Sequence, residues 1–226
     1  MRLFLICFLI CHSAKSIAQT PEKVLQQLLE PFLQSHQLYY ENVMFYFEEG
    51  SKLPADSLRG IFHRNNGMEY MQLGDIEVLE TGALTITVDH EEQIVAVRKI
   101  TQTSSIDEIF DVGQLKSLVE TRKMSVQFGQ NKSNASMLIL RDLTKPDEQM
   151  SIRYDPQTWV MREVIIKTTD PFVDPFASQV GNVTIVIRFE SFTNVSKPFK
   201  YKTEQYVQKK GNAFVGSGKC KGYTVL

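Results

Sequence analysis

The fold is decided by a run of short alternating segments at residues 58–89, which reads LRGIFHRNNGMEYMQLGDIEVLETGALTITVD. Apolar and polar residues alternate here with period two, as expected for strands whose successive side chains point to opposite faces of a sheet. Turn residues separate the segments at Asn65-Asn66-Gly67, Gly74-Asp75 and Thr81-Gly82, and such residues are typical of hairpins. Parallel neighbours would need long crossover connections, so the pattern predicts an antiparallel meander.

The period-two pattern continues on both sides of this stretch. We predict strands near residues 41–49, 58–64, 68–73, 75–80, 83–88, 93–101, 123–129, 136–143, 148–155, 158–168, 182–193, 202–209 and 219–226. A short helical or irregular segment is predicted at residues 106–120, where Ser105 can cap and apolar residues follow at helical spacing. There is no internal repeat and no low-complexity tract, so residues 19–226 are expected to form one domain.

A helix is predicted just before the first strand. Thr20 can cap it, Pro21 suits its first position, and Glu22 complements its positive end. One apolar stripe follows at helical spacing, made of Val24, Leu25, Leu28, Leu29, Phe32 and Leu33. Pro31 lies within the stripe and is expected to kink or restart the helix.

The first 18 residues have the layout of a secretory signal peptide. Arg2 precedes an apolar run from Leu3 to Cys11, and a polar stretch then leads to small residues at Ser16 and Ala18. The run is shorter than the roughly 20 residues needed to span a bilayer, so cleavage between Ala18 and Gln19 is expected. A buried N-terminal strand is the alternative. Cys7 and Cys11 each follow isoleucine, where a lipoprotein signal needs a small residue.

The net charge of the chain after the expected cleavage limits the classes of partner that we expect. Removal of residues 1–18 leaves 208 residues, with 23 of the 25 basic residues and all 26 acidic ones. This small negative excess gives no reason to expect nucleic acid or an anionic membrane surface as partner. No second apolar run is long enough for transmembrane insertion. Cys220 is the one remaining cysteine, so no internal disulfide is expected.

No motif predicts catalysis, a metal site or a cofactor. His36, His63 and His90 are not spaced for metal binding and are interpreted as surface or turn residues. Gly216-Ser217-Gly218 lacks the rest of a serine elbow. The acidic residues around Asp75 and Asp89, Glu77 and Glu80 among them, are interpreted as solvated turns. We therefore expect a protein that is not an enzyme.

Three strands are apolar on both faces, within Val43–Phe47, Met137–Leu143 and Trp159–Ile166. An antiparallel sheet needs only one dry face, so these strands require a second cover. Either the helical segments or a bound apolar ligand can supply it. A separate loop, residues 170–176, repeats Asp-Pro-Phe and displays Phe172 and Phe176. These rings can anchor the loop, or they can cover a cavity mouth or meet a partner.

Three segments resemble the LolA superfamily of periplasmic lipoprotein carriers. Residues 58–70 resemble the early hairpin of that family, residues 80–89 are similar to its glycine-containing strand, and residues 151–160 resemble its late strand-turn-strand unit. The resemblance implies a mainly β (α+β) fold. In that fold an antiparallel meander forms an unclosed half-barrel, covered by the N-terminal helix and the short internal helical segment. The C-terminal part, a β extension from about residue 201, has no counterpart in the carriers.

The resemblance also implies a function. It predicts a soluble periplasmic binding or carrier protein that shelters an apolar ligand, such as an acyl chain or the lipid of a lipidated protein. The residues expected around the apolar cavity are Leu28, Leu29, Phe32, Phe45, Phe47, Trp159 and Met161. Arg64 is the nearest match to the arginine that gates the lid in that family. The alternative is a structural or interaction protein of the cell envelope, with the same fold, a filled core and an envelope protein as partner.

Overall fold

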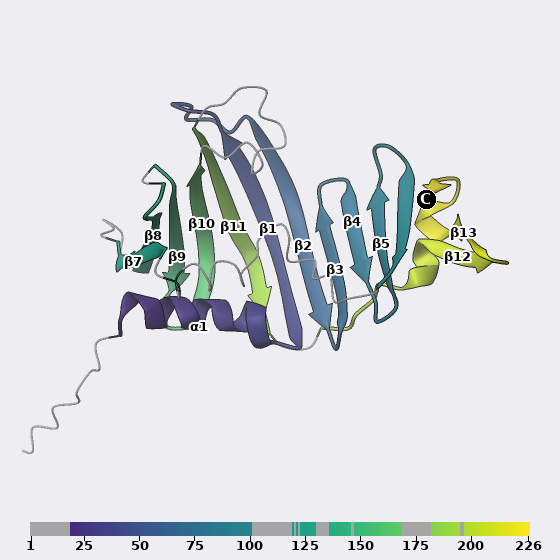
Figure 1. The fold of residues 1–226 in the computed structure, drawn as a ribbon, viewed down its shortest axis with the longest axis horizontal. Helices are drawn as coiled ribbons and strands as arrows, with labels where there is room; N and C mark the ends of the chain where they lie inside the picture. The colour runs from purple at the N-terminus through teal and green to yellow at the C-terminus, as the bar shows by residue number, and fades with distance from the viewer. Residues whose placement is uncertain are drawn as a thin grey trace, which may run out of the picture.

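The computed structural model describes residues 19–100, 119, 121, 123–129, 136–145, 147–168, 182–194 and 197–226. These residues form one α-helix, a large open sheet and a small two-stranded sheet (Figure 1). The elements are α1 (Pro21–Gln34), β1 (Gln37–Phe47), β2 (Asp56–Asn65), β3 (Met68–Leu73), β4 (Ile76–Glu80), β5 (Leu84–Asp89), β6 (Ile94–Lys99), β7 (Met124–Phe128), β8 (Ser136–Asp142), β9 (Gln149–Asp155), β10 (Val160–Thr168), β11 (Val183–Thr193), β12 (Val207–Lys210), β13 (Ala213–Gly216) and β14 (Thr224–Val225), with 3₁₀ helices η2 (Thr203–Gln205) and η3 (Gly218–Cys220).

The large sheet consists of two antiparallel meanders joined side by side, with the short strand β14 added in parallel at the β6 edge. Its order is β14-β6-β5-β4-β3-β2-β1-β11-β10-β9-β8-β7. The junction is the antiparallel pairing of β1 with β11, which runs from Tyr39 opposite Thr193 to Phe47 opposite Thr184. Among the described residues β7 and β14 are the two edges, so the sheet is unclosed. The predicted mainly β fold with an open antiparallel sheet is therefore confirmed.

The hairpin between β2 and β3 shows why the turn residues were informative. Asn66 and Gly67 both have positive φ, 50° and 79°. A two-residue hairpin turn of this kind needs positive φ at both central positions, which asparagine and glycine tolerate best. Strand β3 consequently has the predicted bounds, Met68–Leu73.

The predicted strands at 202–209 and 219–226 are only partly correct. The first contains η2 before β12 begins, and the second begins in η3 and keeps only β14 as a strand. The strand β13 was not predicted. These elements have four residues or fewer, too short for an alternating pattern to stand out from chance.

The helix α1 begins as the sequence predicts. The side chain of Thr20 accepts a hydrogen bond from the Lys23 amide at 3.4 Å, and Pro21 occupies the first turn. The helix continues through Pro31 to Gln34, so it does not restart there. Beyond it, Ser35 N–H donates to the carbonyl of Pro31 at 3.3 Å.

In the described ranges, no helix has the length and apolar character needed to cross a membrane.

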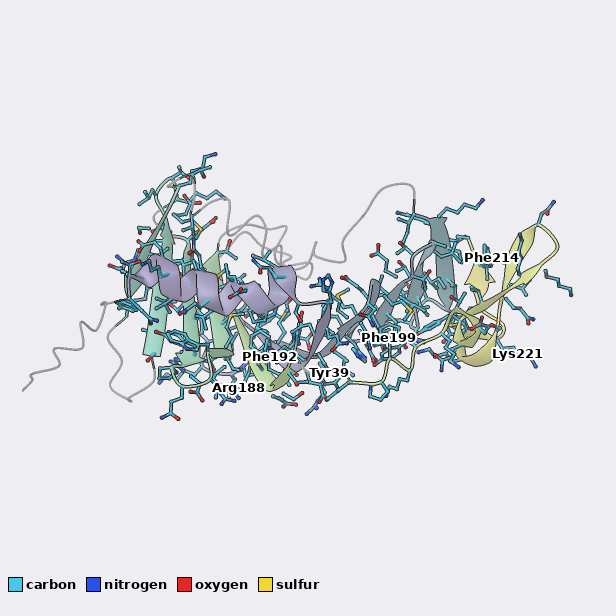
Figure 2. All side chains as sticks on the ribbon, turned by 90° about the horizontal axis from the view of Figure 1, so that it is seen from below. Tyr39, Arg188, Phe192, Phe199, Phe214 and Lys221 are labelled. Atoms are coloured by element: carbon cyan, nitrogen blue, oxygen red, sulfur yellow. The ribbon has the colours of Figure 1, made fainter. Side chains whose placement is uncertain are left out.

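The two halves of the sheet are covered on opposite faces. Helix α1 crosses the lower ends of β7–β11 and β1 (Figure 1), on the face that carries Tyr40 and Met44. Cross-strand pairing places Tyr39, His63, Tyr70 and Leu79 in one row on the other face. The segment after residue 197 packs on that row, and Figure 2 shows α1 and Phe199 on different sides of the sheet.

Some predictions fall on residues outside the described ranges. The signal peptide at residues 1–18 and the loop with Phe172 and Phe176 are among them. Of the predicted helical segment 106–120, the structure describes only Val119, which packs against the core beneath α1.

Candidate binding face beneath the N-terminal helix

The apolar stripe of α1 packs onto one face of the sheet. Leu28 and Leu29 keep 1% and 2% of their surface exposed, and Val24 and Leu25 are equally buried. They belong to a continuous buried cluster whose sheet members are Met44, Tyr46, Leu138, Leu140, Ile152, Tyr154, Met161, Val164, Ile185 and Ile187. The spacing of the stripe dictates this contact, because residues three and four apart lie on one side of a helix. We call this surface of the sheet the α1 face.

Five aromatic rings gather where α1 ends. The Phe32 ring lies 5.7 Å from Tyr40 and 5.5 Å from Phe192, measured between ring centroids. Tyr40 stacks on Phe62 at 5.1 Å and meets the edge of Phe189 at 5.6 Å. Of these rings, sequence reasoning identified only Phe32. The other four come from β1, β2 and β11, and β11 is far from β1 in sequence, so no local pattern connects them.

A buried polar atom lies beside Phe189, in the cross-strand row next to the one that holds Tyr40, Phe62 and Phe192. Asn42 follows Tyr40 on the α1 face of β1 and pairs with Gly60 of β2. Its side-chain Oδ1 is buried and has no hydrogen-bond partner among the described residues. A Cβ on Gly60 would lie 2.2 Å from this oxygen, so glycine leaves the room that Asn42 occupies.

Arg64 ties the end of α1 to the sheet. Its Nη1 donates to the carbonyl oxygen of Phe32 at 2.7 Å, and its Nε donates to Glu69 Oε1 at 2.5 Å. The guanidinium carbon also lies 5.3 Å from the centroid of the Phe62 ring. The last carbonyls of a helix have no partner within the helix. Arg64 supplies one for Phe32 and so fixes the helix beside the aromatic cluster.

The structure divides the predicted cavity residues between the two faces. Leu28, Leu29, Phe32 and Met161 belong to or pack against the cluster beneath α1, and so does Trp159. Trp159 has positive φ, 56°, and stacks on Tyr154 at 5.9 Å. Phe45 and Phe47 lie on the opposite face, because Met44 and Tyr46 occupy the alternate positions of β1. Phe45 there lies 5.4 Å from the Arg188 guanidinium.

A second buried cluster lies beneath the C-terminal segment and corrects the interpretation of Glu77. This carboxylate is 5% exposed and does not belong to a solvated turn. Tyr70, Tyr206, Lys219 and His90 all donate to it, at 3.0, 2.9, 2.5 and 2.7 Å. Burial raises the pKa of Glu77, but the hydrogen bonds from Lys219, His90 and Tyr206 outweigh burial and hold the pKa below its ordinary value. The described residues contain no group of three side chains that could hold a metal ion here or elsewhere.

His63 is also not a surface residue. It is 3% exposed and lies among the rings of Tyr39, Phe199 and Tyr201, at 5.4, 5.0 and 5.9 Å. Burial lowers the pKa of His63, so the imidazole is neutral at pH 7. The environment of His63 depends on the packing of the C-terminal segment against β2. A single histidine in a sequence does not indicate such packing.

Comparisons with known proteins find similarity among solved structures only. No protein-family model and no curated protein matches the chain. The structure is similar to an uncharacterized conserved protein from Thermus thermophilus, with TM-score 0.44 and 8% identity over 92% of this chain and 99% of that one. It is also similar to a LolA superfamily protein from Nitrosomonas europaea, with TM-score 0.33 and 9% identity over 80% of this chain and 96% of that one.

A further similarity is to the Pseudomonas aeruginosa MucA/MucB complex, with TM-score 0.39 and 12% identity over 80% of this chain and 59% of that one. Structural neighbours thus include the LolA superfamily, the family that the sequence motifs resemble. At such low TM-scores these similarities carry no conclusion about a ligand or a partner.

Proposed function

We propose that the chain is an exported, non-catalytic binding protein of the periplasm that holds an apolar ligand, such as an acyl chain, against the α1 face. In this proposal the sheet is the wall of a half-barrel and α1 is its cover. The LolA-like motifs of the sequence agree with this function. The observation that supports this function most strongly is how α1 packs on the sheet. The aliphatic side chains of this amphipathic helix contact an apolar sheet face, and Arg64 hydrogen-bonds to the last turn of the helix.

The chemistry of this face suits an acyl chain. Its buried members among the described residues are aliphatic residues, two methionines and two tyrosines. A hydrocarbon chain can replace the aliphatic contacts without adding a polar group to be buried. The aromatic cluster beside Phe32 would form the mouth of the site. The Arg64 guanidinium next to it would steady the helix while a ligand enters.

Uptake of a fluorescent fatty acid tests the proposal. The chain from Gln19 onward is expected to raise the emission of the probe, and unlabelled fatty acid is expected to reverse the effect. Native mass spectrometry of the protein purified from its own periplasm is expected to show a bound ligand. A protein that neither takes up the probe nor carries a ligand would contradict the proposal.

A filled-core envelope adaptor is the second candidate, and the near-complete burial of Leu28 and Leu29 favours it. Leu29→Ala separates the two functions. A close-packed site loses about 2–5 kcal/mol on such a change. For a carrier we expect a loss of roughly 1–2 kcal/mol, because a loosely filled site collapses more easily, together with altered probe uptake.

Urea unfolding and probe titration measure both quantities. Leu33→Ala is the matched control, because Leu33 is on the same helix but 40% exposed. A loss above about 3 kcal/mol for Leu29→Ala, with no probe uptake by the unsubstituted chain, would leave the adaptor as the function.

A further inference from the structure

A groove lies on the face opposite α1, at the upper ends of β1, β10 and β11 (Figure 1). Its volume is about 700 Å³, within the range of known binding pockets. Two cross-strand rows form its floor. Ile165 pairs with Val186 in one row, and Phe47, Thr184 and Lys167 align in the next. All of these side chains are half-buried except that of Lys167, which is exposed.

The walls of the groove are acidic. Glu48 and Glu49 follow β1 on one side, and Asp147 belongs to the loop between β8 and β9 on the other. Asn182 Nδ2 donates to Glu49 Oε1 at 2.8 Å. Within the described residues, neither Glu48 nor Asp147 has a side-chain ion pair or hydrogen bond. Among the described residues that line the groove, Lys167 is the one cation, so this part of the lining has an excess of negative charge.

We propose that this groove binds a short extended segment of a partner protein, in which an apolar side chain is flanked by lysine or arginine. The apolar side chain would lie on the Ile165–Val186 row, and the flanking cations would reach the carboxylates of the two walls. Opposite charges in such an arrangement give specificity and raise the association rate. The same carboxylates repel nucleic acid and anionic lipid. This site is separate from the α1 face and does not depend on the function proposed for that face.

Fluorescence anisotropy with two labelled peptides tests the groove. One peptide has the sequence Lys-Leu-Phe-Leu-Lys, and the other has glutamate in place of both lysines. We expect the basic peptide to bind, the acidic one to fail, and binding to weaken as salt is raised. The double variant Glu48→Lys with Asp147→Lys is expected to raise the Kd of the basic peptide by about tenfold or more. Lys167→Glu is expected to lower the Kd.

The double variant Glu91→Lys with Glu92→Lys is the control, because it makes the same charge change at exposed positions between β5 and β6. It is expected to leave the Kd unchanged. Equal binding of both peptides, no binding of the basic one, or an equal effect of the two double variants would overturn the proposal. Competition between the peptide and a fatty acid would also overturn it, because the peptide would then occupy the α1 face. Absence of peptide binding leaves the fatty-acid assay of the proposed function unaffected.

Discussion

At the scale of single residues, Glu77 connects parts of the chain that are far apart in sequence. It lies on β4, and it receives hydrogen bonds from Tyr206 and Lys219 of the C-terminal segment as well as from His90. His90 in turn bonds to Tyr223 through its Nδ1 at 3.0 Å. A buried carboxylate is costly unless it is hydrogen-bonded to this extent. The network therefore makes the fold of the C-terminal segment depend on one side chain.

Glu77→Gln is expected to lower the free energy of unfolding by about 1–3 kcal/mol at pH 7, because the bond from the charged Lys219 loses its charged acceptor. The folded-state pKa of Glu77 lies below its ordinary 4.5. Its contribution is therefore complete above that pH and is lost as the pH falls through the folded-state pKa. As the pH falls through the folded-state pKa of Glu77, the free energy of unfolding is expected to decrease less for the variant than for the unsubstituted chain.

Chemical denaturation at a series of pH values measures this difference. Glu91→Gln is the control, because Glu91 is exposed. Identical pH profiles for Glu77→Gln and the unsubstituted chain would show that the carboxylate does not hold the segment.

At the scale of elements, the C-terminal segment is built from short pieces that tertiary contacts hold in place. Strand β14 runs parallel to β6, and the Leu226 amide donates to the Val95 carbonyl at 2.9 Å. Helix η3 packs near η2, where Ser217 N–H donates to the Tyr206 carbonyl at 2.8 Å. Gly218 begins η3 at φ 53°. A Cβ at Gly218 would meet the backbone oxygen of Gln205 at 2.5 Å.

Gly218→Ala is therefore expected to lower the free energy of unfolding by about 1–3 kcal/mol, since it adds both backbone strain and a contact with backbone that cannot move aside easily. Gly82→Ala is the matched control, because a Cβ there meets no atom within 4 Å. Thermal unfolding of both variants, followed by circular dichroism, measures the effect. Equal melting temperatures for the two variants would contradict the expectation.

At the scale of the whole molecule, two separate buried clusters stabilise one sheet from opposite sides. The cluster beneath α1 uses β1 and β7–β11, and the cluster beneath the C-terminal segment uses β3–β6. Cys220 is buried in the second cluster as a free thiol. The stability of the described part of the chain thus comes from packing and hydrogen bonding without a disulfide.

Thermal unfolding of the chain from Gln19 onward is expected to give the same transition with and without reductant. Cys220 is its one cysteine, and burial raises the pKa of this thiol and so slows its reactions. A fall of several degrees in reductant would reveal an intermolecular disulfide.

The N-terminus of the exported protein is expected to be Gln19, because Ser16 and Ala18 provide the small residues that signal peptidase requires. N-terminal sequencing of protein recovered from the periplasm checks this position. A start at Cys7 or Cys11 with the added mass of a lipid would contradict this prediction and indicate a lipid anchor.

Local signals in the sequence predicted most strands of the sheet. They also predicted the part of the candidate site that α1 contributes. Asn66-Gly67 fixed a hairpin, Thr20 and Pro21 fixed the start of α1, and the spacing of Leu25, Leu28 and Leu29 identified its buried stripe. The cavity implied by the family resemblance grouped Phe45 and Phe47 with that stripe, although they face away from it. A strand that is apolar on both sides does not reveal which side the helix covers.

The sequence by itself determined α1, the described strands from β1 to β11 to within a few residues, and the hairpin order within each meander, because hydrophobic period and turn chemistry depend on neighbouring residues. Only the tertiary structure decided that β1 pairs with β11, that the two clusters lie on opposite faces, and that Glu77 and His63 are buried. These features depend on contacts between residues more than 100 positions apart, such as Tyr206 with Glu77 at a separation of 129. Residue spacing along the chain carries no information about such contacts until the sheet and its two covers have assembled.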